Sequence, residues 1–186
     1  MRLMIGVIRA LFVLLMLAAP IPARAADYVD KAALDELFTE LRTVHDAGAA
    51  NDIVAQIWSI WFNPDNTDLA DRMTRASAAM SSQDFGAALS ILSGIVKDYP
   101  DYSEGWNQRA TLFYIMNDYE ASLADIDKVL ELEPRHFGAL SGRVMIYLQQ
   151  GRRAEALKQM IAALAIDPYL DARKYFPELS QNTTNV

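Results

Sequence analysis

The 186-residue sequence contains no cysteine and only two histidines, His45 and His136. Without thiols the chain has no disulfide framework, so we expect packing alone to stabilise it. The two histidines stand far apart, with no cysteine or paired acidic residue at ligand spacing, which argues against a metal site. The sequence also lacks a phosphate-binding glycine loop, a nucleophile elbow and a carboxylate constellation. We therefore expect neither a cofactor nor catalysis.

Basic residues are scarce, since 17 lysines and arginines stand against 24 aspartates and glutamates, a net charge of −7. Nucleic acids and anionic membrane surfaces are bound by basic patches. The charge balance therefore argues against both as partners. The acidity could favour basic partner segments, or it could serve only to keep the protein soluble.

The long apolar run of this chain lies at its N-terminus, where Arg2 and Arg9 precede residues 10–19. About ten apolar residues are too few to span a bilayer, which takes roughly 20. We predict that residues 1–25 are a secretory signal peptide, cleaved after Ala25, rather than a membrane anchor. The mature protein would be periplasmic or secreted, without stable membrane insertion. Since the segment takes three arginines with it, the mature net charge would be −10.

The strongest pattern is an internal period, because Pro100, Pro134 and Pro168 stand 34 residues apart and each ends a helical pattern. A period of this length is typical of a solenoid of helix pairs, in which neighbouring pairs bury the apolar faces that one pair leaves exposed. Such a stack has a concave surface on which another protein can lie. The pattern thus predicts an all-α interaction module.

The middle block, residues 103–136, resembles a tetratricopeptide repeat (TPR) on six residues in the family's order: Trp106, Ala110, Phe113, Leu123, Leu130 and Pro134. Block 137–170 fits nearly as well, while block 69–102 is weaker, with Arg72 and Ala79 at the two aromatic positions. The resemblance implies a TPR-type α-solenoid of antiparallel helix pairs. Asp84 and Asp118 stand in the turns within two of the pairs, where we expect them to cap the second helices.

Residues 26–68 carry two further apolar stripes, which we interpret as a degenerate helix pair that caps the N-terminal end of the stack. Its two tryptophans, Trp58 and Trp61, are expected in the core, with an exposed aromatic binding patch as the alternative. At the other end, residues 171–186 should form a short capping helix that covers the last pair, followed by a disordered tail.

The resemblance implies that the binding surface is the groove lined by the first helix of each pair. Its predicted residues are Met73, Ser77, Met80, Asn107, Thr111, Tyr114, Ser141, Met145 and Leu148. This set contains no charge, and only Asn107 matches the TPRs that clamp a C-terminal carboxylate, so that function is not supported. A mildly apolar groove instead suits an extended or helical peptide.

A row of arginines also follows the period, at Arg75, Arg109 and Arg143. The run of residues 123–130 resembles a TPR subclass that couples such an arginine with an aspartate. We therefore predict a structural ion pair between Arg109 and Asp125, and expect the other two arginines to reach elsewhere or to extend into solvent.

These features favour a non-catalytic, exported TPR adaptor that binds a protein or peptide of the cell envelope through its concave groove. The alternative is a structural or assembly subunit of an envelope complex that acts by self-association or fixed packing. An exposed Trp58 and Trp61 would favour the alternative. The sequence leaves the partner, the process and the oligomeric state open.

Overall fold

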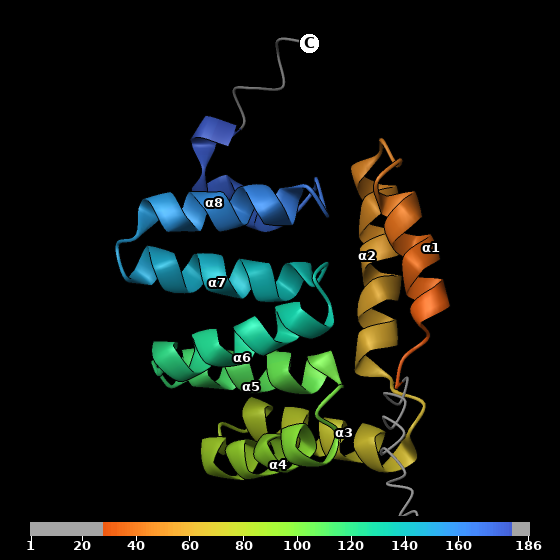
Figure 1. The fold of residues 1–186 in the computed structure, drawn as a ribbon, viewed down its shortest axis with the longest axis vertical. Coiled ribbons are helices and arrows are strands. Elements are labelled where there is room, and N and C mark those ends of the chain that lie inside the picture. Colours follow the sequence, from red (N-terminus) through yellow and green to blue (C-terminus); the bar gives the residue numbers. More distant parts are fainter. Residues whose placement is uncertain (1–27, 180–186) are drawn as a thin grey trace, which may run out of the picture.

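The computed structural model describes residues 28–179, and this part of the chain is helical and contains no strand (Figure 1). The predicted signal peptide and the residues beyond Leu179 lie outside the described part. The eight α-helices are α1 (Lys31–Leu41), α2 (Ala47–Phe62), α3 (Thr67–Ser81), α4 (Phe85–Asp98), α5 (Ser103–Ile115), α6 (Tyr119–Leu132), α7 (Phe137–Gln149) and α8 (Arg153–Leu164).

Helices α3 to α8 form three antiparallel pairs that stack in chain order, each pair packed on the next (Figure 1). The turns within the pairs repeat with the 34-residue period. A residue with a positive φ follows the first helix of each pair: Gln83 (60°), Asn117 (62°) and Gly151 (70°). A residue in this left-handed conformation ends the helix before it. In the first two turns the next residue, Asp84 or Asp118, accepts the amide of Ala87 or Ala121 and so begins the second helix. The predicted caps are therefore confirmed.

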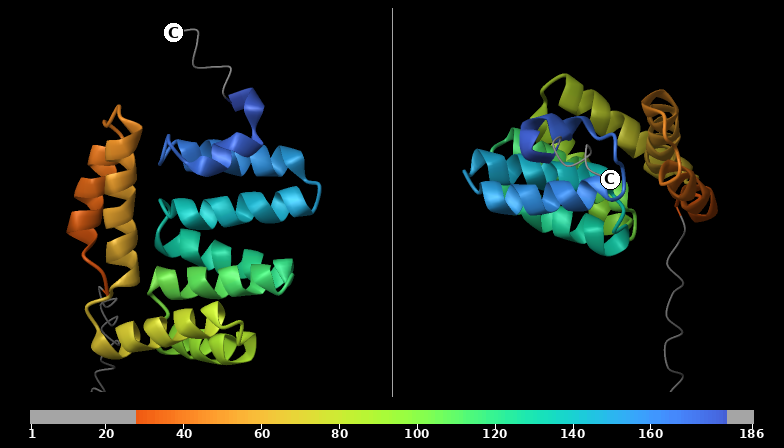
Figure 2. Two further views of the ribbon diagram at one scale, coloured as in Figure 1. Left: turned by 180° about the vertical axis from the view of Figure 1, so that it is seen from behind. Right: turned by 90° about the horizontal axis from the view of Figure 1, so that it is seen from above.

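The N-terminal pair forms as predicted, but it does not cap the end of the stack. In Figure 1, α1 and α2 run across the repeat helices along one side of the solenoid, and the two further views in Figure 2 agree. Their apolar residues form one core cluster with Phe137 of α7 and with Ile166, Tyr169 and Leu170, which follow α8. The pair therefore lies beside the ends of the repeats and packs against more than one of them.

The two tryptophans give a physical reason for this position. The indole of Trp61 is buried and stacks on the ring of His136, with ring centres 4.1 Å apart and planes 7° apart. Trp58 is half-buried and lies edge-on to Phe137 at 5.4 Å. Helices in the stack approach closely through small residues such as Ala76 and Ala88, and two indoles on one helix do not fit that spacing. They pack instead against the start of α7.

The C-terminal cap is shorter than the helix that we predicted. Two 3₁₀ turns, η1 (Asp171–Tyr175) and η2 (Pro177–Leu179), take its place. Phe176 stands between them, fully buried against Val144 of α7 and Met160 of α8. Pro177 cannot continue a helix, because it lacks an amide hydrogen, so a single buried ring covers the last pair.

Candidate functional site

A hollow of about 130 Å³ opens between α5 and α7, with α6 beneath it. Its floor and sides come from ten residues, none of them charged: Asn107, Ala110, Thr111, Tyr114, Ser122, Ile126, Gly138, Ala139, Gly142 and Met145. Because α5 and α7 are the first helices of adjacent pairs, this is the groove surface that the repeat resemblance implies. Four of the predicted groove residues, Asn107, Thr111, Tyr114 and Met145, line the hollow.

The other predicted groove residues lie elsewhere. Met73 is buried, and Met80 packs beside it in the core between α3 and α4. Leu148 packs on the C-terminal cluster around Phe176. Ser77 is exposed, and the hydroxyl of Ser141 is buried without a hydrogen-bond partner among the described residues.

The register of α3 explains why Met73 lies in the core and not in the predicted groove. Its buried stripe is Leu69, Met73 and Ala76, so Met73 faces α4 rather than the groove. Arg72, which occupies the aromatic position of the repeat pattern, forms ion pairs with Asp68 and Asp98 instead of packing inside.

A buried polar network lies beside the hollow and holds Asn107. The amide nitrogen of Asn107 donates to both carboxylate oxygens of Glu104, at 3.2 and 3.1 Å, and Gln108 donates to the same carboxylate at 2.6 Å. Nε2 of His136 lies 3.0 Å from Glu104 Oε2. Glu104 and His136 are both fully buried and Asn107 is 7% exposed, so the network is shielded from solvent.

Sequence reasoning gave His136 no role and missed it as a member of this network. It is the N-cap of α7, where its Nδ1 accepts the amide of Ala139 at 3.1 Å. Nδ1 is therefore an acceptor, so the proton of the neutral ring is on Nε2 and is donated to Glu104. One signal in the sequence could have indicated the N-cap role, because His136 directly precedes Phe137, the first residue of the third block.

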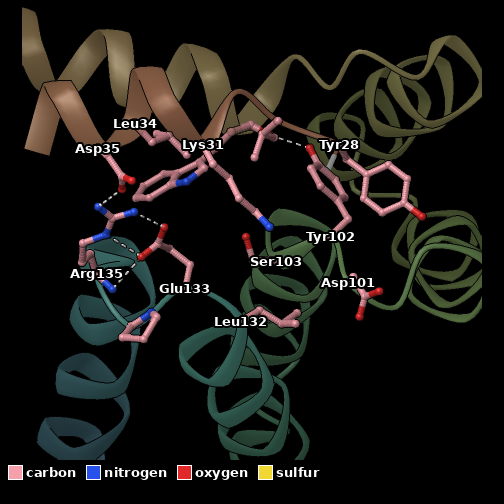
Figure 3. A pocket seen from close by; sticks show the side chains of 13 residues that line it. Tyr28, Lys31, Leu34, Asp35, Asp101, Tyr102, Ser103, Leu132, Glu133 and Arg135 are labelled. Atoms are coloured by element: carbon pink, nitrogen blue, oxygen red, sulfur yellow. Dashed lines mark hydrogen bonds and ion pairs between the residues drawn. The ribbon is translucent and has the colours of Figure 1, made fainter. Parts of the chain in front are cut away.

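A second and larger cavity than this hollow, about 550 Å³, lies where the N-terminal pair meets the repeat ends (Figure 3). Arg135 closes one side: its guanidinium donates twice to Glu133 and once, at 2.6 Å, to Asp35 of α1. On another side the buried hydroxyl of Tyr102 donates to the backbone oxygen of Trp61 at 2.5 Å. The hydrogen bond to Glu133 raises the pKa of Arg135, and burial raises that of Tyr102.

Both groups therefore keep their protons at neutral pH, and their bonds join α1 and α2 to the repeats. Since two hydrogen bonds across the junction, from Arg135 to Asp35 and from Tyr102 to Trp61, join the walls of this cavity, we interpret it as structural. The smaller hollow between α5 and α7 is the better candidate for binding.

The predicted ion pair between Arg109 and Asp125 is present. Nε and Nη2 of the guanidinium donate to the two carboxylate oxygens at 2.7 and 2.8 Å. The aspartate side chain is 6% exposed and the arginine side chain 18%. Arg143 reaches back to Asp127 of the preceding pair, while Arg75 is exposed without an ion pair among the described residues. The pair links α5 to α6 below the concave surface and is structural.

Across residues 28–179 no group of three or more histidine, cysteine or acidic side chains could hold a metal ion. In the same range, every helix is too short or too polar to cross a membrane.

Comparisons with known proteins place these helix pairs in a family. Residues 103–136 match the tetratricopeptide repeat family. A TPR repeat-containing protein of Rhizobium etli is 37% identical over 145 residues, 78% of this chain and 71% of that protein. DnaJ homolog subfamily C member 3 of Rattus norvegicus is 29% identical over 103 residues, 55% of this chain but only 20% of that protein. The crystal structure of MamA protein is similar in fold, with a TM-score of 0.50 and 15% identity over 82% of this chain and 77% of MamA. The chain therefore belongs to the tetratricopeptide repeat proteins.

Proposed function

We propose that this protein is an exported adaptor that binds a protein or peptide of the cell envelope in the hollow between α5 and α7, without catalysis of its own. TPR folds bind proteins or peptides on stacked helix pairs, and that coarser role follows from the family. The observation that carries the finer proposal is the hollow itself. It joins two adjacent repeats, is uncharged, and gathers four predicted groove residues in one place.

The surroundings of the hollow support recognition by side-chain contacts. The ring of Tyr114 and the thioether of Met145 offer apolar, adaptable surface on facing helices. Asn107 adds one polar group, and Trp58 lies against the start of α7 at Gly138, which places the N-terminal pair at one end of the hollow. A partner segment lying between α5 and α7 would thus contact both helices, with α6 beneath it.

The test compares capture of envelope proteins by the mature chain with capture by a groove variant. Asn107→Ala is unsuitable, because it would also unpair the buried Glu104. Thr111→Ala with Tyr114→Ala removes two side chains of the hollow; because Tyr114 also packs against Tyr119 and a core cluster, the variant should lose some stability but stay folded, which its melting curve checks. A captured partner should then bind more weakly by about 1 kcal/mol or more.

Ile161→Ala is the matched control, since Ile161 is 53% exposed on α8 and lies outside the hollow. Capture should survive this change. If the groove variant binds as well as the unchanged chain does, another surface recognises the partner, and self-association or fixed packing in an envelope complex becomes the better explanation.

Export is tested separately by the intact mass of the protein recovered from the periplasm or the medium. The proposal expects a chain that begins at Ala26, because the small residues before it suit signal peptidase. A membrane-bound protein that retains residues 1–25 would show that the segment is an anchor.

A further inference from the structure

The side-chain amide of Asn107 has a defined direction. Its nitrogen is committed to Glu104, and no donor in the described part of the chain reaches its oxygen Oδ1. The residue as a whole is only 7% exposed and lines the hollow, and in residues 28–179 the only buried side-chain atom without a partner is Ser141 Oγ, so Oδ1 of Asn107 keeps some contact with solvent. A ligand that covered this oxygen without donating to it would leave a buried acceptor unpaired, which is costly. Because the nitrogen is held by Glu104, the oxygen is the end of the amide left for the hollow.

We propose that the hollow recognises an aromatic side chain that ends in a hydrogen-bond donor, such as a tyrosine of the partner, with its hydroxyl on Asn107 Oδ1. This inference rests on the proposed function, in which a partner segment lies between α5 and α7. It adds the polarity of the site: the protein accepts the hydrogen bond and the ligand donates it.

The amide cannot easily turn over. Glu104 accepts from Asn107, Gln108 and His136, and a carboxylate surrounded by donors has only acceptor oxygens to offer. Turning the amide would set Oδ1 of Asn107 against that carboxylate. His136 is itself held by its cap bond to Ala139 and by the stacked indole of Trp61. The N-terminal pair therefore helps to set the direction of an amide in the groove.

The size and lining of the hollow favour an aromatic ring. Its volume, about 130 Å³, is close to that of a cavity of about 150 Å³ that is known to take up benzene. Tyr114 and Met145 offer the ring and sulfur contacts that aromatic groups favour. On the α7 side Gly142 has no side chain to fill the hollow, and a Cβ there would lie 3.5 Å from Ile126 Cδ1 in the lining.

The same geometry disfavours a carboxylate ligand. An anion would bring acceptor oxygens to Asn107 Oδ1, and no lysine, arginine or histidine lines the hollow. A clamp for a C-terminal carboxylate requires the opposite orientation, with the amide nitrogen as donor.

The experiment measures binding of two small probes to the mature chain by NMR titration: p-cresol, which carries a phenolic donor, and 4-methylanisole, which has the same ring and oxygen but no donor. We expect p-cresol to bind about threefold to tenfold more tightly, the worth of one hydrogen bond. The signals of Met145 and Tyr114 should shift. Equal affinities, or tighter binding of 4-methylanisole, would overturn the inference.

Glu104→Gln supplies the decisive variant, because a glutamine can donate to Asn107 Oδ1 and let the amide turn its nitrogen toward the hollow. The ratio of the two affinities should then fall toward one or invert, and a ratio that is unchanged in the folded variant would refute the role of Glu104. Glu155→Gln is the matched control and should keep the ratio, since Glu155 is exposed on α8, accepts from Arg152 and lies outside the hollow.

The two proposals fail in different ways. If neither probe binds while partner capture still depends on Tyr114, the aromatic donor is wrong and the groove function stands. If p-cresol binds selectively but capture ignores Tyr114, the polarity of the hollow stands and the adaptor function through it falls.

Discussion

Arg109 and Asp125 permit a quantitative test of how burial sets the strength of an ion pair in this fold. Arg109→Met would leave the carboxylate of Asp125, 6% exposed, without its two charge-assisted hydrogen bonds. Breaking a buried pair typically costs about 3–5 kcal/mol. The Arg109 side chain is 18% exposed and also lies over the rings of Trp106 and Phe113, so the pair is shielded from water largely but not completely. We expect the free energy of unfolding to fall by about 3 kcal/mol, the lower end of that range.

Asp125→Asn should cost less, about 2 kcal/mol, because the asparagine oxygen can still accept from the guanidinium. The double variant should be more stable than the sum of the two losses predicts, by at least about 1 kcal/mol. Urea unfolding of all four proteins, with unchanged m-values, measures this coupling.

The chain contains its own control for this test. Arg143 and Asp127 also stand 16 residues apart on neighbouring helices and form an ion pair, but the Asp127 side chain is 75% exposed. An exposed pair is worth at most about 1 kcal/mol, so Arg143→Met with Asp127→Asn should show little coupling. Additive losses at Arg109 and Asp125, or equal coupling in the two cycles, would refute the reasoning from burial.

Two further changes test the packing and the acid response. Gly138→Ala would place a Cβ 2.5 Å from Cη2 of Trp58 and should cost about 1–3 kcal/mol, whereas Gly142→Ala meets only Ile126 Cδ1 at 3.5 Å and should be neutral or stabilising by up to about 1 kcal/mol. Equal denaturation midpoints for these two variants would show that Trp58 moves aside for the added methyl group without a cost in stability. Burial raises the pKa of Asp167, so the folded state binds its proton more tightly than the unfolded state does, and this residue removes stability as the pH rises from about 4. Asp167→Asn keeps the acceptor for the amide of Tyr169 without the charge and should therefore gain stability over the unchanged chain between about pH 4 and pH 7, as measured by unfolding at each pH. A difference that stays constant with pH would contradict this assignment.

The local features of this protein could be predicted because they depend on residues close together in the chain. The 34-residue spacing of Pro100, Pro134 and Pro168 marks the ends of second helices, since proline stops a helix wherever it occurs. Asp84 and Asp118 cap helices with their own side chains, three residues from the amides that they accept. The pairing of Arg109 with Asp125 also follows from the repeat, because antiparallel neighbours in one pair have a defined register.

The position of the N-terminal pair could not be predicted in this way, and neither could the polarity of the proposed binding site. Helix periodicity predicts which face of α2 is buried, but not which surface buries it. Only the tertiary structure brings Trp61 onto His136, a residue 75 positions away in the chain, and joins His136 through Glu104 to Asn107. The side chain of Asn107 was evident in the sequence as a groove residue. The direction of its amide was not, because that direction depends on buried partners that come together only when the chain folds.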